Sequence, residues 1–336
     1  MKVLLTLDYE LYLGLKCGSV ENCLIIPMSQ ILREVNSYNV KFSIFVDAAY
    51  LYMLSKQRDK YVSLEKDYDD ICKHLLYLQE HGHDIQLHIH PQWYFSEYNG
   101  VEWSMDTMHY KLCDVDEKQM ATLFLESKEL LDNIIGKKTI VFRAGGFSAQ
   151  PTKLLRKLFY ATGIRVDSSV CPGASYDSDC QKYDYTHVPS KSLYHFSEDI
   201  CKEDTLGDFT EFPIAMINNV SPVFHWKLAL TKLAVKFDAG RQFKRMGDGI
   251  SVKTTGSSIM ERMTRFSRTM ATIDEYKASL LKQAYREAMA NGNKYFCVLG
   301  HPKLATSYSI KKLGEFCDYV MKSNGEFVTF SDCYEL

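Results

Sequence analysis

The chain has 336 residues, of which 46% are hydrophobic and 24% are charged, with 40 Lys and Arg against 42 Asp and Glu. This balance is that of a folded globular protein and excludes disordered and collagen-like chains. The net charge of −2 also argues against a whole-chain basic surface of the kind that neutralises nucleic-acid phosphates. The length admits one large α/β domain or two medium ones, so the number of domains has to come from the pattern of elements.

The predicted elements alternate along the chain between short apolar runs and amphipathic stretches. The predicted strands are residues 3–7, 41–46, 84–88, 139–142, 163–166, 209–214, 295–299 and 327–330. The predicted helices are residues 28–39, 63–80, 117–135, 152–162, 276–290 and 310–323. This alternation predicts a parallel sheet, and seven or eight strands favour a closed or nearly closed barrel over a doubly wound open sheet. No internal repeat or Pro/Gly-rich linker divides the chain, so we expect one domain over residues 1–336.

Three segments interrupt the alternation. Residues 91–116 and 171–208 are aromatic and polar without clear periodicity, which predicts long strand-to-helix loops, the usual place of barrel active sites. Residues 225–268 hold ten basic and three acidic residues, so this basic segment carries +7 and the rest of the chain −9.

The ten cysteines are scattered and form no CxxC pair, which favours buried thiols in a reducing compartment over disulfides or a cysteine-ligated zinc. The first apolar run, between Lys2 and Asp8, is too short for a signal peptide. No run reaches the ~18 apolar residues of a membrane span. The sequence therefore predicts a cytoplasmic protein that starts at its first strand.

Residues that could carry chemistry follow the ends of the predicted strands. Asp8 and Glu10 are two positions apart, so they share one side of an extended chain, and two close carboxylates need a cation or an Arg to compensate them. The alternative is a pair of solvated turn carboxylates. His88 and His90 have the same spacing, which suits a single metal ion, with core or surface histidines as the alternative.

Three further strands end in the same manner. Arg143 enters a Gly-rich turn, where it could pair with the carboxylates of the first strand, bind a substrate anion, or remain an ordinary exposed loop Arg. Asp167 could act as a site carboxylate or as a helix N-cap. His301 follows an apolar strand and is placed for acid or base work, with a solvated turn His as the alternative.

All five positions lie at the same end of successive predicted strands, which is how a barrel active site is assembled. The sequence has no GxSxG elbow, and neither a P-loop nor a GxGxxG follows any predicted strand. Metal-assisted hydrolysis is the chemistry that remains.

In their order along the chain, these motifs resemble the NodB-type polysaccharide deacetylases, a family of metal-dependent sugar N-deacetylases on a distorted (β/α)7 barrel. The matching segments are Thr6-Leu7-Asp8-Tyr9-Glu10, the His segment from Gly82 to Trp93, Phe142-Arg143-Ala144-Gly145-Gly146, Asp167-Ser168-Ser169, Leu299-Gly300-His301-Pro302 and, for the second strand, Phe42-Ser43-Ile44-Phe45-Val46. The resemblance implies a single barrel domain with long strand-to-helix loops.

The resemblance also implies roles for single residues. Asp8 matches the base that takes a proton from a metal-bound water, and Arg143 matches the residue that pairs with this base. His301 matches the general acid that protonates the departing amine, and Asp167 matches the carboxylate that orients this His. An acid and a base on opposite sides of a polarised amide agree with general hydrolytic chemistry.

The implied metal site departs from the family pattern at two positions. Tyr9 separates two acids that are usually adjacent, and Gln92 stands four residues after His88, where a second His is usual. The ligand set is therefore assigned to Glu10, His88 and His90. Two His and one carboxylate suit one divalent metal, with zinc expected first and cobalt, iron, manganese or nickel as alternatives.

The expected reaction is removal of an N-acyl group, in the first place N-acetyl, from an amino sugar or a sugar-containing intermediate of surface polysaccharide biosynthesis. Trp93, Gly145 and Gly146 are assigned to substrate binding. The substrate is expected in nucleotide- or lipid-linked form, with no nucleic-acid partner. The basic segment could touch an anionic membrane, or form a solvated basic helix and loop packed on the barrel. Two rival functions are glycoside hydrolysis on a related barrel and sugar binding by an inactive homologue.

Overall fold

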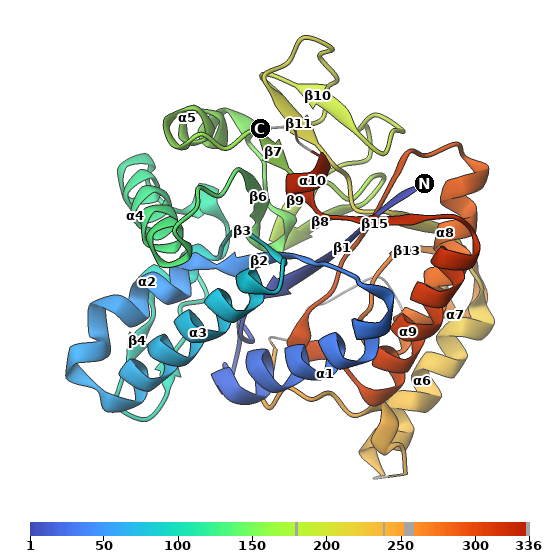
Figure 1. Ribbon diagram of the computed structural model, residues 1–336, viewed down its shortest axis with the longest axis horizontal. Helices are drawn as coiled ribbons and strands as arrows, with labels where there is room; N and C mark the ends of the chain where they lie inside the picture. Colours follow the sequence, from blue (N-terminus) through green and yellow to red (C-terminus); the bar gives the residue numbers. More distant parts are fainter. Residues whose placement is uncertain (179–180, 238, 252–258, 334–336) are drawn as a thin grey trace. The chain divides into compact units, whose positions relative to one another are not determined.

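A computed structural model describes residues 1–178, 181–237, 239–251 and 259–333 of the chain (Figure 1). Cys180 and Lys253, which the sequence counts include, lie outside the described residues. The nine cysteines in the described part are free thiols. Across these same ranges, no helix combines the length and the apolar character needed to cross a bilayer.

The chain forms two compact units, and strand β1 (Lys2–Tyr9) contributes its first half to one and its second half to the other. Unit 1 comprises Met1–Leu5, Glu10–Val40 and Ala215–Phe327, and unit 2 comprises Thr6–Tyr9, Lys41–Ile214 and Val328–Leu336. The expectation of a single domain stays a prediction.

Unit 2 is a largely parallel sheet with helices packed against it. Its strands are hydrogen-bonded in the order β10-β11-β7-β6-β3-β2-β1, and only the β10–β11 pair is antiparallel. Helices α3, α2, α4 and α5 succeed one another beside this sheet in Figure 1, with α2 packed against both α3 and α4. In chain order the elements are β2 (Ser43–Asp47), α2 (Ala48–Gln57), α3 (Val62–Glu80), β3 (Asp84–Ile89), β4 (Glu97–Tyr98), β5 (Trp103–Ser104), α4 (Glu117–Ile135), β6 (Val141–Ala144), α5 (Thr152–Thr162), β7 (Val166–Asp167), β8 (Ser175–Ser178), β9 (Gln181–Asp184), β10 (Tyr194–Phe196), β11 (Phe209–Glu211) and α10 (Phe330–Cys333).

The central strands of unit 2 bring the motif residues to one edge of the sheet. Strands β2, β3 and β6 are buried along their whole length, as parallel strands covered on both faces are. Because the strands run in the same direction, their carboxyl ends share an edge. The register confirms this directly, since Asp47 of β2 pairs with His88 of β3, and His88 pairs with Arg143 of β6.

Unit 1 is mainly helical and contains the first half of β1. Strand β14 pairs with β1 in parallel, β12 and β13 form an antiparallel pair, and α9 packs against both α1 and α8. In chain order the elements are α1 (Ile26–Val35), β12 (Met216–Val220), α6 (Pro222–Lys236), α7 (Ile259–Thr264), β13 (Ser267–Met270), α8 (Leu281–Ala290), β14 (Tyr295–Val298), α9 (Ser307–Lys322) and β15 (Glu326–Val328), which also pairs with β1.

The structure confirms the parallel sheet and corrects some of its connections. Helices α4 and α5 have the predicted bounds, but α2 was not predicted, because its first seven residues are nearly all buried and show no polar stripe. Residues 171–208 hold the β8–β9 hairpin and β10 and lead into strand β11, so this segment is not a strand-to-helix loop.

Candidate metal centre and active site

Tyr9 stands between two acids, Asp8 and Glu10, at the end of β1. Because side chains alternate across a strand, the two acids share one face and Tyr9 lies on the other. Asp8 and Glu10 are both buried, with 2% and 6% of their surface exposed. Tyr9 points to the other side, where its hydroxyl and Nδ1 of His74 on α3 are 2.8 Å apart. The intervening Tyr9 is thus a core residue that fastens β1 to α3, and it leaves the two acids on a common face.

Arg143 fixes the position of the Asp8 carboxylate. The guanidinium is fully buried and donates from Nη1 to Asp8 Oδ1 at 2.6 Å and to Thr6 Oγ1 at 2.9 Å. Its Nε and Nη2 donate to the carbonyl and the hydroxyl of Ser168 at 2.8 and 3.0 Å, and its plane lies 4.0 Å from the Phe45 ring centre. Such a planar, many-donor contact sets the carboxylate orientation as well as its charge partner. Of the pairings considered for Arg143, the structure therefore shows the one with Asp8.

Strand β3 presents two imidazoles to the same region. His88 is 1% exposed, and its Nδ1 lies 2.7 Å from the carbonyl oxygen of Arg143. A carbonyl only accepts, so Nδ1 donates to it and Nε2 is the ring nitrogen that could bind a metal, an arrangement typical of metal-ligating histidines.

The second imidazole belongs to His90, which follows β3. Its backbone N–H donates to Asp47 Oδ1 at 3.3 Å. Gly145 lets β6 end close to it, because a Cβ at residue 145 would lie 2.7 Å from His90 Nδ1 and 2.6 Å from the Ile89 carbonyl oxygen. Any side chain at residue 145 would displace His90, and the assignment of Gly145 to substrate binding stays a prediction.

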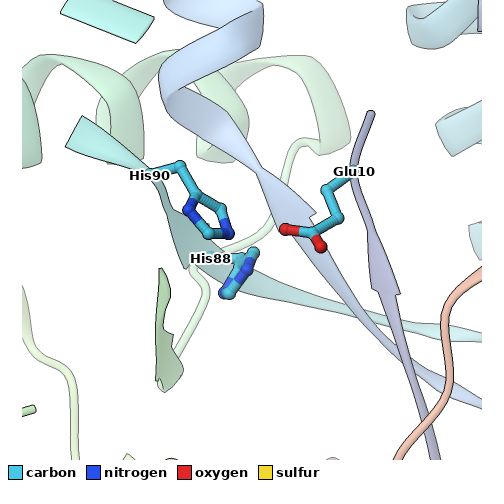
Figure 2. Close-up of side chains that lie close together, drawn as sticks. All are labelled: Glu10, His88 and His90. Carbon is cyan, nitrogen blue, oxygen red and sulfur yellow. The ribbon is translucent and has the colours of Figure 1, made fainter. Parts of the chain in front are cut away.

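Glu10, His88 and His90 form a cluster of three buried donors. One ligand atom of each residue lies within 4.8 Å of those of the other two. Figure 2 shows the Glu10 carboxylate and both imidazole rings directed toward a common point. One carboxylate oxygen and two imidazole nitrogens are a donor set for zinc and for neighbouring divalent transition metals, so the residues present fit such an ion.

His301 carries its own carboxylate partner, which is Asp274. The Asp274 carboxylate lies 2.8 Å from His301 Nδ1 and accepts the His301 backbone N–H at 2.8 Å. Burial by itself would raise the pKa of Asp274, but the charge and hydrogen bonds of His301 outweigh burial and hold this pKa below its ordinary value. The arrangement directs Nδ1 to the carboxylate and leaves Nε2 for another contact. Glu10 Oε1 lies 3.6 Å from Nε2.

The resemblance implies that Asp167 orients His301, but in the structure the carboxylate that contacts His301 belongs to Asp274. Asp167 is fully buried and accepts the Ser169 backbone N–H at 2.7 Å, and it is paired across the sheet with Glu211 of β11. Burial raises the pKa of Asp167 to about 6, against hydrogen bonds from Glu211 and Ser169 and the charge of Arg143. Asp274 could have been found from the sequence, since it also ends an apolar run, at residues 270–273.

A second functional residue that the sequence reasoning missed is Lys303. This side chain is 6% exposed, and its Nζ donates to Glu10 Oε1 at 2.8 Å and to the Leu11 carbonyl at 2.6 Å. The signal was its position two residues after His301, in a turn that begins with Pro302. Glu10 thus has a buried ammonium beside it as well as the two imidazoles.

The other assigned substrate contacts have structural explanations. Trp93 is fully buried, donates its indole N–H to Asp47 Oδ2 at 2.8 Å and packs on Tyr50, with the ring centres 4.5 Å apart. Trp93 therefore has a structural role in this cluster, and its assignment to substrate binding stays a prediction. Gly146 has φ +58°, and its carbonyl accepts from Gln181 Nε2 at 3.0 Å. This backbone conformation favours glycine, and the assignment of Gly146 to substrate binding stays a prediction.

Comparison with known proteins places the fold. No family model and no curated protein matches the sequence. Among solved structures, a Mycobacterium smegmatis protein assigned as a polysaccharide deacetylase aligns over 99% of this chain and 88% of its own, with 16% identity and a TM-score of 0.53. The chain has the polysaccharide deacetylase fold. Puue allantoinase aligns over 98% of this chain and 88% of its own, with 12% identity and a TM-score of 0.51.

The deacetylase fold confirms the fold class expected from the sequence, a mixed α/β architecture with parallel strands flanked by helices. At these identities the likeness extends to the fold alone. A protein named as an allantoinase shares the same fold. The reaction therefore has to be inferred from the residues at the strand ends rather than from the fold.

Proposed function

We propose that this protein is a metal-dependent hydrolase that removes an N-acyl group, in the first place N-acetyl, from an amino sugar. The observation that carries the proposal is the Glu10, His88 and His90 donor cluster at the end of a strand whose other acid, Asp8, is fixed by Arg143. A buried donor set beside a positioned carboxylate is the arrangement that metal-assisted amide hydrolysis needs.

Glu10, His88 and His90 would hold one divalent ion, with zinc as the first choice. The ion supplies Lewis acidity, which polarises the acyl carbonyl and makes water more acidic. Asp8 is the proposed base. Arg143 donates to its Oδ1 at 2.6 Å and so keeps this buried carboxylate in place to take a proton from the attacking water.

His301 is the proposed acid, which gives its Nε2 proton to the departing amine. Asp274 keeps the ring in the orientation in which Nδ1 faces a carboxylate, and it stabilises the imidazolium that a general acid requires. This division gives base and acid to separate side chains, so neither has to change its role within one turnover.

The substrate form and location are part of the same proposal. We infer a nucleotide- or lipid-linked amino sugar that is deacylated in the cytoplasm during surface polysaccharide assembly. The basic segment has a net charge of +7, which supports a phosphate-bearing substrate or a nearby anionic surface.

Metal analysis joined to a substrate screen tests the proposal. The purified protein should carry about one divalent ion per chain, and mass spectrometry of N-acetylated nucleotide sugars should show the loss of an acetyl group. His88→Ala and His90→Ala should each lower bound metal, whereas His187→Ala, at an exposed position, should not. Unchanged metal content in both variants would refute the ligand set.

The screen also separates the rival functions. A glycoside hydrolase would release a sugar without acetate, and an inactive homologue would bind sugar without metal or turnover. Either result would replace the proposed deacylase.

A further inference from the structure

Helix α6 of unit 1 carries an exposed row of large apolar side chains. They stand three, four, three and four positions apart, so they line one face of the helix and its end. We call this row the apolar face; its members, with their exposed fractions, are Val223 (60%), Trp226 (56%), Leu230 (61%), Leu233 (51%) and Phe237 (70%). Single exposed apolar residues are common, but a continuous row of five on one helix marks a surface that binds something.

The apolar face is not the face by which α6 packs on its own unit. That role belongs to the other side of the helix, where Phe224 is 8% exposed. On the same side Leu228, Thr231 and Val235 line a pocket of about 430 Å³. Trp226 is held in place from α7, because its indole N–H donates to the Met263 carbonyl at 3.1 Å. The helix thus has one face inward and a second, oriented apolar face outward.

Cations border the apolar face. Lys227 and Lys236 lie on α6 to either side of the row by helical spacing. Neither lysine makes an ion pair with a residue of the described ranges. Lys244, by contrast, lines the pocket on the other side of the helix. Long basic side chains beside a row of Leu, Phe and Trp form the pattern of a helix that lies in the plane of a lipid interface.

The charge also selects among partners. A second copy packed on the same face would bring the same lysines against one another, because a two-fold interface is self-complementary. An anionic lipid surface satisfies both features at once, since its acyl region accepts the apolar face and its headgroups attract the lysines.

We propose that the apolar face of α6 docks on the surface of an anionic lipid bilayer. This inference is independent of the proposed chemistry, because it rests on residues of α6 that have no part in the metal centre. It gives the full chain a peripheral membrane contact and places Lys227 and Lys236 of α6 at the headgroups.

Vesicle partitioning of the full chain tests the docking. Co-sedimentation should be strong with vesicles of equal parts phosphatidylcholine and phosphatidylglycerol, weak with phosphatidylcholine alone, and reduced by added salt. The double variant L230E/L233E should lower partitioning by at least about tenfold, which corresponds to about 1.4 kcal/mol. A matched control, V62E/L206E, changes two apolar residues outside α6 that are even more exposed, at 82% and 91%, and should partition as the unchanged protein does.

Tryptophan fluorescence supplies an independent readout. Trp93 is fully buried and Trp103 is partly buried, so a blue shift on adding vesicles should come from Trp226 and should be absent in W226F. If L230E/L233E were to misfold, K227E/K236E keeps the test, since it alters only the charges and should remove the preference for phosphatidylglycerol.

Three results would overturn the proposal. They are no partitioning into the anionic vesicles, equal partitioning of a folded L230E/L233E, and a dimer without lipid that this variant converts to monomer. The last result would assign the apolar face to a second copy of the chain.

Discussion

Two carboxylates at the end of β1 each meet a buried cation, and the two cations are of different kinds. Asp8, in unit 2, faces the guanidinium of Arg143, whereas Glu10, in unit 1, faces the ammonium of Lys303. Arg143 has no exposed surface and keeps its charge at all accessible pH, and the hydroxyl and carbonyl of Ser168 hold its remaining donors.

Lys303 is held by fewer contacts. Its Nζ has the Glu10 carboxylate, the Leu11 carbonyl and the Tyr12 ring, whose centre lies 5.2 Å away. An ammonium is a compact point charge on a flexible stem, so it can withdraw from a carboxylate that takes another cation. We therefore expect the Arg143–Asp8 pair to hold the proposed base permanently. The Lys303–Glu10 pair should give way when the proposed metal ligand binds an ion.

Removing the arginine should have the largest effect. Arg143→Leu leaves Asp8 buried without its partner, so we expect the free energy of unfolding to fall by about 4 kcal/mol. Urea unfolding at neutral pH measures the loss. Arg156→Leu is the matched control, because its Glu198 partner is largely exposed and such pairs contribute less than about 1 kcal/mol. An equal loss in the two variants would contradict a permanent, buried pair.

Lys303→Met should destabilise the metal-free protein by about 3 kcal/mol, since Glu10 then lacks its ammonium. Zinc should stabilise this variant more than it stabilises the unchanged protein, because no lysine competes for the carboxylate. Thermal unfolding with and without zinc measures both effects. Lys282→Met, which removes an exposed lysine 3.7 Å from its carboxylate partner, should show neither. The same zinc-induced shift in Lys303→Met and in the unchanged protein would show that the lysine does not compete with metal.

Asp274→Asn tests His301, the proposed acid, whose Nε2 lies near Glu10. The amide cannot stabilise a positively charged His301, so we expect kcat to fall by about 100-fold and the alkaline limb of the pH–rate profile to move to lower pH. Asp274→Glu should recover part of the rate. A profile that stays in place in Asp274→Asn would remove Asp274 from the positioning of His301.

The sequence could predict which strand ends gather the chemistry, but not which partners their side chains choose. Asp8, His88 and Arg143 were found because the carboxyl ends of parallel strands share an edge, which is a property of topology. The partner of His301 could not be found in this way, because hydrogen-bond pairing depends on turn geometry at the level of single ångströms. Asp167 and Asp274 both end apolar runs, and only the coordinates show that Asp274 is the one bound to His301.

The burial of individual side chains was the other property that the sequence could not predict. Trp93 resembles a sugar platform in sequence, yet the aromatic cluster with Tyr50 and Trp103 encloses it. The apolar face of α6 shows the reverse, because its helical spacing is also that of a core helix. In both cases the periodicity gives the face, and only tertiary packing decides what covers it.

The buried Asp167 tests how far the charge of Arg143 acts on a second carboxyl, and this test depends on pH. Its folded pKa, about 6, is above the ordinary value of 3.8, so its contribution to stability is complete below about pH 4 and is lost as the pH rises through about 6. Asp167→Asn mimics the protonated form. Relative to the unchanged protein, the variant should therefore gain about 2 kcal/mol of unfolding free energy between pH 4 and pH 7.

Urea unfolding of both proteins across this range measures the difference, with Asp59→Asn as an exposed control. A constant difference between Asp167→Asn and the unchanged protein would mean that the carboxyl stays ionised throughout. A gain that grows as the pH rises above 4 would mean that folded Asp167 keeps its proton up to about pH 6, against the charge of Arg143. Arg143 would then fail to keep the Asp167 carboxyl ionised at pH values below about 6. Its effect would be confined to Asp8, the proposed base.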